Sequence, residues 1–178
     1  MKPLRKRDRV LGVGAVLLFA LSVAAPATAS DFVLRVDGLS CPFCAYGVEQ
    51  KLLGVPGVAS IEVLLDDGQI VLGLTRGAAL DVAALAAAVD QSGFTLKTLL
   101  VRGAVGTLSR KNAQGLFLTS SDPRITFRLK LKADDALRAA GLADSPGQVV
   151  ANGTIREFHS IPIELDVSEI TPAGTRRP

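Results

Sequence analysis

Residues 38–44 read Gly-Leu-Ser-Cys-Pro-Phe-Cys and hold both cysteines of the 178-residue chain, Cys41 and Cys44. The stretch lies between an alternating strand pattern at 32–36 and an amphipathic helix pattern at 45–53. A C-x-x-C pair at a strand-to-helix turn can bring two thiolates to one soft metal ion, or it can close a reactive disulfide. The function question is therefore a choice between metal binding and thiol redox chemistry.

The patterns on either side of this turn predict two strand-helix-strand halves. Asp66-Asp67-Gly68 is a strong hairpin signal between two apolar runs. Asp81 is expected to cap a second helix, which Gly93 ends. The expected elements are, in order, a strand at 32–36, a helix at 45–53, strands at 58–65 and 69–75, a helix at 81–93 and a strand at 94–101. This order predicts a ferredoxin-like α/β sandwich over residues 30–101.

Residues 102–170 predict a different, strand-rich domain. The expected strands are 101–108, 116–119, 125–131, 149–158 and 161–167. One short helix is expected between the third and fourth strands, at 134–140, capped by Asp134 and ended by Gly141. Five strands with a helix after the third are typical of an OB-like β-barrel. The fold class is therefore α+β, and the last segment, 171–178, is expected to be a flexible tail.

The first 29 residues have the pattern of a secretory signal. A basic stretch at 2–9 precedes an apolar run at 10–25, and Ala27-Thr28-Ala29 fits a cleavage site before Ser30. We expect a cleaved signal peptide at 1–29, with an uncleaved N-terminal anchor as the alternative. The signal is of bacterial type, which predicts a periplasmic protein with no stable membrane insertion after cleavage.

The net charge of +3 belongs to that first segment. Removing residues 1–29 takes away five of the 20 basic residues and one of the 17 acidic ones, which leaves a net charge of −1. A balanced charge of this size gives no electrostatic reason to bind nucleic acid. We therefore expect no nucleic-acid partner.

Residues 31–101 resemble the heavy-metal-associated domain family, which is found in copper chaperones, metal-pumping ATPases and the periplasmic mercury-binding protein. The matching residues are 38–44, Gly57-Val58 and Gly93-Phe94. Leu39 stands where the family usually has Met, and Pro42-Phe43 is bulkier than the usual pair between the cysteines. The resemblance implies a ferredoxin-like fold with Cys41 and Cys44 as the metal ligands. It also implies that Phe94 packs under the metal loop, and that Leu39 fills the apolar socket of the usual Met.

The chemistry of the two thiolates favours the same kind of site. Thiolates prefer Cu(I), Hg(II) and Zn(II) to hard ions, and two sulfurs suit the near-linear coordination of Cu(I) and Hg(II). Zinc is less favoured because it usually takes four ligands, and the chain has one His and no third Cys. Cys44 is expected near the start of the first helix, where the helix dipole favours a thiolate.

The alternative is a thiol-disulfide module with Cys41 as the nucleophile and Cys44 as the resolving thiol, since Cys-Pro-Phe-Cys also resembles the motif of glutaredoxins. A purely structural disulfide is the third possibility, although so short a loop constrains little chain. His159 is expected at the surface and Tyr46 in the helix packing. The sequence contains no nucleophile-base-orienter set, so no enzyme is expected.

The sequence thus predicts a periplasmic protein that binds and transfers one soft metal ion, Cu(I) or Hg(II), through Cys41 and Cys44. Its expected partners are a metal donor or acceptor protein, with a membrane metal transporter among the candidates.

Overall fold

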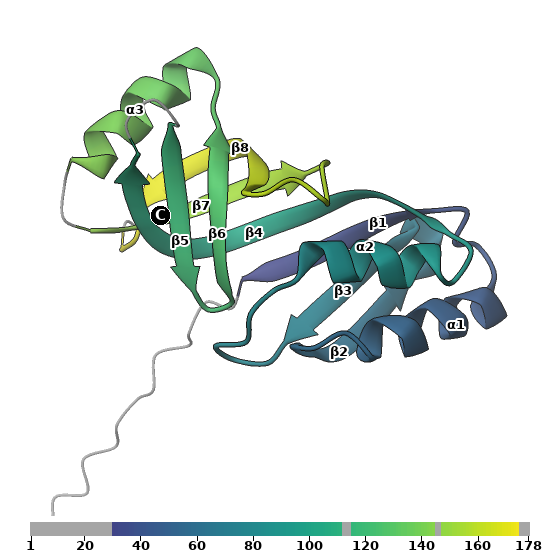
Figure 1. Ribbon diagram of the computed structural model, residues 1–178. Coiled ribbons are helices and arrows are strands. Elements are labelled where there is room, and N and C mark those ends of the chain that lie inside the picture. Colours follow the sequence, from purple (N-terminus) through teal and green to yellow (C-terminus); the bar gives the residue numbers. More distant parts are fainter. Residues whose placement is uncertain (1–29, 112–114, 145–146, 175–178) are drawn as a thin grey trace, which may run out of the picture.

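The computed structural model describes residues 30–111, 115–144 and 147–174 (Figure 1). The expected signal peptide at 1–29 lies outside them. The elements are, in order, β1 (Asp31–Asp37), α1 (Pro42–Leu53), β2 (Val58–Leu64), η1 (Leu65–Asp67), β3 (Gln69–Leu74), α2 (Val82–Asp90), β4 (Thr95–Arg110), β5 (Leu116–Ser121), β6 (Arg124–Lys130), α3 (Ala133–Ala143), β7 (Gln148–Ile155) and β8 (Ile163–Pro172). None of the helices in this part of the chain is both long and apolar enough to span a membrane.

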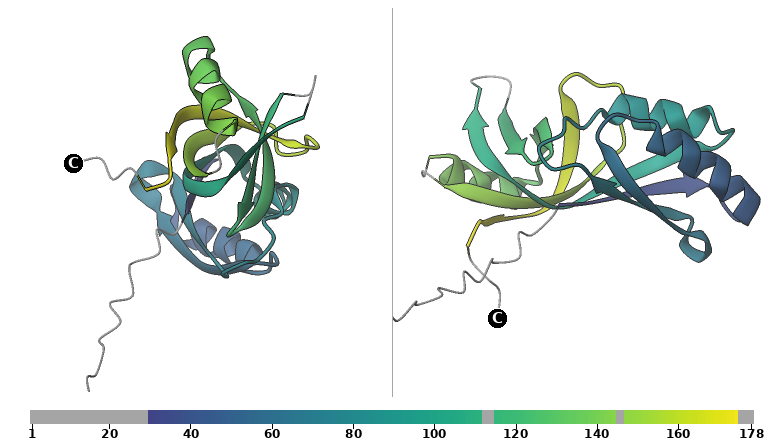
Figure 2. Two further views of the ribbon diagram at one scale, coloured as in Figure 1. Left: turned by 90° about the vertical axis from the view of Figure 1, so that its left-hand side faces the viewer. Right: turned by 90° about the horizontal axis from the view of Figure 1, so that it is seen from below.

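The first part of the chain, called here the α/β half, is a sheet with two helices on one face. The strands lie in the order β2-β3-β1-β4, and α1 and α2 cover the same side of them (Figures 1 and 2). The apolar residues of β1 alternate as the sequence predicts, so that Phe32, Leu34 and Val36 are buried beneath the helices. The helices contribute Val48, Leu52, Leu85 and Val89 to the same core.

The second part, called here the barrel, is a closed ring of five strands. Its strands follow the order β4-β5-β6-β8-β7, and the pairing of β7 with β4 closes the ring. The β6–β8 pair is parallel and the other pairs are antiparallel. Phe127 and Leu118 are buried in the core, whereas the neighbouring Phe117 is buried outside it, beneath Lys111. α3 lies between β6 and β7 in the chain. The likeness of this barrel to the OB-fold stays a prediction.

The two halves share β4, which is a single strand of 16 residues. Its first part pairs with β1, from Thr95 opposite Asp37 to Arg102 opposite Asp31. Its last part pairs with β5 from Gly106 onward, and residues 99–107 pair with β7 on the other side. The domain boundary expected between residues 101 and 102 therefore falls inside a strand, and no linker separates the halves.

A bend in β4 lies where the strand passes from one half to the other. Gly103 has a φ of 68°, and the register against β7 shifts between Val101 and Ala104. This backbone conformation favours glycine, because side chains of other residues are strained there. The Gly103 N–H donates a 2.7 Å hydrogen bond to Oδ1 of Asn152 on β7, which fixes the bend.

Two expectations for the barrel were wrong in their boundaries. α3 begins after Lys132 and runs through Gly141 to Ala143. Asp134 is therefore not its cap but lies in the first turn, where a carboxylate interacts favourably with the helix dipole. Thr171 and Pro172, which were expected to belong to a flexible tail, lie in β8 and pair with Val150 and Val149. The rest of the expected tail from residue 175 lies outside the described residues.

The shared strand predicts that both halves unfold together. Leu99 is fully buried and pairs with Leu34 on one side and Ile155 on the other. We expect Leu99→Ala to lower the free energy of unfolding by about 2–5 kcal/mol. Urea unfolding would show one transition by both Tyr46 fluorescence and circular dichroism.

The control is Leu137→Ala on α3, because Leu137 is 80% exposed and its truncation should change the stability by less than about 0.5 kcal/mol. Two separated transitions in the unsubstituted protein would contradict a single folding unit.

Candidate metal centre

The loop before α1 is shaped by one glycine and one buried leucine. Gly38 has a φ of 78°, and its carbonyl accepts a 3.0 Å hydrogen bond from the Ser40 N–H. Leu39 is buried in the core, as the resemblance implies. The ring of Phe94 lies beneath the loop, since a Cβ placed on Gly38 would be 4.0 Å from Phe94 Cδ1. The loop is thus anchored by the burial of Leu39 and by its contact with Phe94.

α1 starts three residues earlier than expected, at Pro42 rather than Ala45. The fixed φ of proline suits the first helical position, where the missing N–H would have no partner anyway. Cys41 therefore occupies the N-cap position with an extended backbone, at φ −114° and ψ 127°. Cys44 lies in the first turn, so both sulfurs stand at the same end of the helix.

The structure brings the two cysteines together as free thiols. Cys41 is half-buried and Cys44 is exposed. The pKa of Cys41 is lowered by the N–H of Cys44, by the thiol of Cys44 and by the N–H of Phe43, in that order of size. The Cys41 side chain makes no full cap hydrogen bond with the helix. The positively polarised hydrogens of these groups nevertheless lie beside its sulfur and stabilise the thiolate.

The same contact acts in the opposite direction on Cys44. Its pKa is raised, first because its thiol donates to the Cys41 sulfur, then by burial and by the charge of Cys41. We predicted from the sequence that the helix dipole would favour the thiolate form of Cys44, and this prediction was wrong. The free N–H groups of the first turn face the residue before the helix, so Cys41 carries the first negative charge.

The outer face of α1 is apolar next to the sulfur pair. Phe43 is 91% exposed and Tyr46 is 64% exposed. The expectation that Tyr46 packs in the core was wrong, because Val48, Leu52 and Val55 fill that side and Tyr46 points the other way. Leu53 is also exposed, so α1 carries apolar side chains on both faces. The later turns of α1 also carry Glu49, Gln50 and Lys51, so its exposed aromatic surface is confined to the turns next to the cysteines.

His159 is exposed, as expected, and does not belong to the cysteine pair. It lies in the β7–β8 connection and lines a groove with residues 79–83 at the start of α2. The cysteines lie at the opposite end of the α/β half, beyond the end of β1 (Figure 1). Within the described ranges, no three His, Cys, Asp or Glu side chains gather as a possible metal cluster.

Comparison with known proteins points to one family for this part of the chain. Residues 33–95 match the family described as the heavy-metal-associated domain. A 64-residue segment is 39% identical to copper-transporting ATPase 2 of Rhizobium meliloti and covers 36% of this chain and 8% of the ATPase. A 41-residue segment is 44% identical to the copper chaperone CopZ of Staphylococcus aureus and covers 23% of this chain and 60% of the chaperone. The chain thus spans less than two thirds of these relatives.

Two solved structures are also similar to a part of the chain. One is described as a CopZ metallochaperone, with 29% identity and a TM-score of 0.35, and it covers 37% of this chain and 97% of that one. The other is described as crosstalk between Cu(I) and Zn(II) homeostasis, with 27% identity and a TM-score of 0.33, and it covers 38% and 94%.

The asymmetry of the two thiols predicts their order of alkylation. Because the pKa of Cys41 lies below the ordinary value of 9.0 and that of Cys44 lies above it, Cys41 holds more thiolate at neutral pH. We expect iodoacetamide to label Cys41 first, with its pH profile shifted to lower pH, as read by peptide mass spectrometry. Faster labelling of Cys44 at every pH, as exposure alone would give, would contradict this electrostatic assignment.

Proposed function

Because residues 33–95 form a heavy-metal-associated domain, we propose that the chain binds one Cu(I) ion between Cys41 and Cys44 and passes it to a partner protein. The observation that carries the proposal is the pair of free cysteines at the start of α1, inside the matched segment. One sulfur is already biased toward the thiolate by backbone N–H groups, and soft thiolates prefer Cu(I) to hard cations.

The choice of copper rests on the ligand set and on the relatives. Two sulfurs can complete the near-linear coordination of Cu(I), whereas Zn(II) requires further ligands. The named relatives are a copper-transporting ATPase and a copper chaperone. Hg(II) accepts the same two-sulfur geometry and is therefore a competing ion in the test.

The transfer step is a ligand exchange with no change of oxidation state. Binding of Cu(I) by both thiolates releases the S–H protons of Cys41 and Cys44 to solvent, and the pKa order means that Cys44 keeps its proton longer. A partner thiolate then forms a third sulfur-copper bond, and one of the original bonds breaks. Cys44 is exposed and Cys41 is half-buried, so the incoming thiolate displaces Cys44 first and Cys41 last. No enzymatic step is required.

The apolar face of α1 would receive the partner. A protein that docks on the start of α1 can bury Phe43 and Tyr46, which are three residues apart and share one exposed face of the helix next to Cys44. Burial of two aromatic side chains is a typical source of binding energy at an interface. We propose a membrane metal transporter or its metal-binding domain as the partner, and the periplasm as the compartment.

The difference in exposure between the two cysteine residues argues against the thiol-disulfide alternative. A redox pair works best when its low-pKa thiol is the accessible one, because that sulfur attacks the substrate. Here the thiol with the lowered pKa, Cys41, is the less exposed of the two. Turnover of a disulfide substrate by the metal-free protein would instead support a thiol-disulfide function of Cys41 and Cys44.

The metal site predicts one bound ion per chain. We expect the reduced protein to take up one equivalent of Cu(I) in an anaerobic competition with bicinchoninate, followed by thiolate-to-copper charge-transfer absorbance. Cys41→Ser and Cys44→Ser should each abolish the 1:1 complex, because a single thiolate cannot complete the coordination. Ser40→Ala is the matched control, since it keeps both sulfurs and the Ser40 N–H bond to Gly38. A reduced protein that leaves Cu(I) and Hg(II) uncoordinated would end the proposal.

If Phe43 and Tyr46 form the docking face for the partner, their replacement should slow copper transfer without weakening copper binding. We expect the double variant Phe43→Ser, Tyr46→Ser to keep its Cu(I) affinity but to transfer copper about tenfold more slowly to a soluble metal-binding domain of a copper ATPase, as the loss of roughly 1.4 kcal/mol would give. Transfer to glutathione, which needs no docking face, should be unchanged. Leu137→Ser is the control for an equally exposed apolar side chain. An unchanged rate to the protein acceptor would exclude this face.

A further inference from the structure

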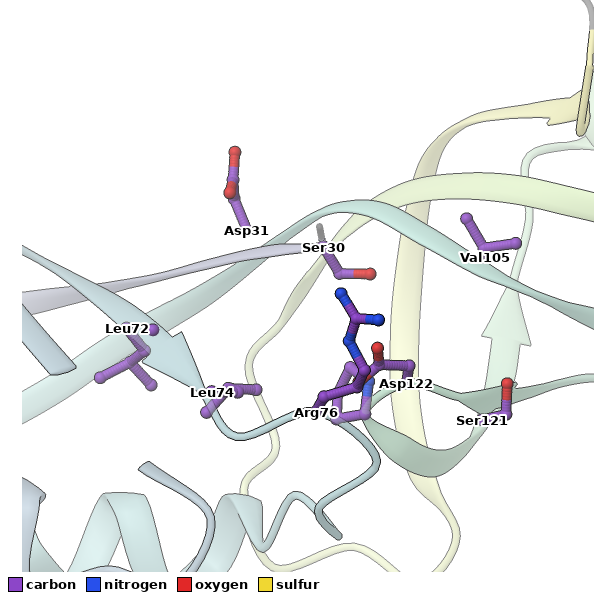
Figure 3. A pocket seen from close by; sticks show the side chains of 10 residues that line it. Ser30, Asp31, Leu72, Leu74, Arg76, Val105, Ser121 and Asp122 are labelled. Atoms are coloured by element: carbon purple, nitrogen blue, oxygen red, sulfur yellow. The ribbon is translucent and has the colours of Figure 1, made fainter. Parts of the chain in front are cut away.

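A second concave site, called here the junction pocket, lies where the α/β half meets the barrel (Figure 3). Its volume is about 470 Å³, within the range of small-molecule sites. Four separate segments line it: the start of β1, the end of β3 with the turn that follows, Val105 on β4, and the β5–β6 turn. It lies at the opposite end of β1 from the cysteines, about 20 Å away at the rise of a seven-residue strand.

The walls of the junction pocket are held by hydrogen bonds between the two halves. The Gly77 N–H donates to Asp122 Oδ1 at 2.8 Å, and Arg124 Nε donates to the Gly77 carbonyl at 2.8 Å. The Arg124 N–H donates to the Ala78 carbonyl at 2.7 Å. On the other wall, Ser30 Oγ donates to the Gly103 carbonyl at 3.1 Å. The pocket is therefore preformed rather than a gap between loosely attached parts.

Arg76 supplies a positive charge to the junction pocket. Its guanidinium reaches up into the pocket toward the Ser30 hydroxyl (Figure 3). No ion pair or hydrogen bond joins this guanidinium to another described residue. The hydroxyl of Ser121 lines the same space. A guanidinium is a typical partner of a carboxylate, which it can bind through two parallel N–H groups.

Asp122 supplies a negative charge on the same wall. Its Oδ1 accepts from Gly77, and the carboxylate stands beside the Arg76 side chain (Figure 3). The Asp31 carboxylate also lines the pocket but points away from Arg76. A simple anion would be repelled by these carboxylates, and a simple cation by Arg76. A ligand that carries both charges matches both sides.

We propose that the junction pocket binds a small zwitterion, of which an α-amino acid is the simplest example. The ligand carboxylate pairs with Arg76, and its ammonium group pairs with Oδ2 of Asp122, since Oδ1 accepts from the Gly77 N–H. Its apolar body lies against Leu72, Leu74 and Val105, which form the apolar wall of the pocket. This activity is independent of copper and gives the barrel a role of its own, because Val105, Ser121 and Asp122 come from the barrel.

The test is a nuclear magnetic resonance titration of the ¹⁵N-labelled, reduced, metal-free protein with L-leucine. We expect saturable shifts of the Gly73, Gly77 and Val105 amides with a Kd of about 1 mM or tighter. The matched compounds are 4-methylpentanoate, which lacks the ammonium group, and 3-methylbutylamine, which lacks the carboxylate. Each should bind at least fivefold more weakly than leucine.

Two variants test the contributions of Arg76 and Asp122 separately. Arg76→Gln and Asp122→Asn should each weaken leucine binding by about tenfold, as the loss of one charge-assisted pair would give. Asp122→Asn keeps an oxygen that can accept from the Gly77 N–H, so the wall stays in place. Arg102→Gln, on the neighbouring stretch of β4, is the control and should bind leucine normally.

Three outcomes would overturn the proposal: no saturable shift with leucine, binding of 4-methylpentanoate as tight as that of leucine, or equal binding by the Arg76→Gln and Arg102→Gln variants. Cys41→Ser should leave the titration unchanged, so a failure here is separate from a failure of copper binding.

Discussion

The hydrogen-bonded pairing of β4 on both of its sides is the constraint on which the rest of the structure depends. Between Leu99 and Val101 the strand pairs with β1 on one side and β7 on the other, and beyond Gly103 it continues as a wall of the barrel. One continuous ladder thus joins a domain of metal-binding type to a barrel. It also sets their geometry, because the β1–α1 turn lies at the end of the sheet away from the barrel (Figure 1). The sulfur pair is therefore left accessible.

At that accessible end, the chemistry follows from the unsatisfied N–H groups of a helix start. The first turn of any helix has N–H groups without backbone partners, and Cys41 stands where a capping side chain normally stands. A sulfur in this place is stabilised as an anion, and the neighbouring thiol is kept protonated. Deprotonation of the pair therefore begins at Cys41, and the Cys44 proton is lost later, which makes metal uptake by both sulfurs dependent on pH.

Much of this could be predicted from the sequence, because the signals are local. The C-x-x-C turn, the Asp-Asp-Gly hairpin and the Asp81 cap depend on neighbouring residues, and Asp81 does accept from the Ala84 N–H at 2.9 Å. The shared strand could not be predicted, since residues 94–101 and 101–108 each have the length of an ordinary strand. Their continuity depends on pairing with β7, some 50 residues away in the chain. The orientation of Tyr46 was likewise missed, because aromatic residues on a helix usually mark the buried side.

The junction pocket was also invisible in the sequence, because Arg76 and Asp122 are 46 positions apart and belong to different halves. The turn after β3 and the β5–β6 turn come together only in the folded structure, and no local sequence pattern predicts that contact.

The pairing of β7 with β4 affects the tendency of the chain to aggregate. A four-stranded sheet of this topology has two outer strands whose backbone groups can recruit foreign strands, a common route to aggregation. Here the barrel occupies one of them, and the remaining outer strand, β2, carries a register irregularity near Ser60 and the charged Glu62. The barrel thus covers the edge of β4 that the α/β half alone would leave unpaired. A fragment that contains only the α/β half would expose this edge and would be prone to aggregation.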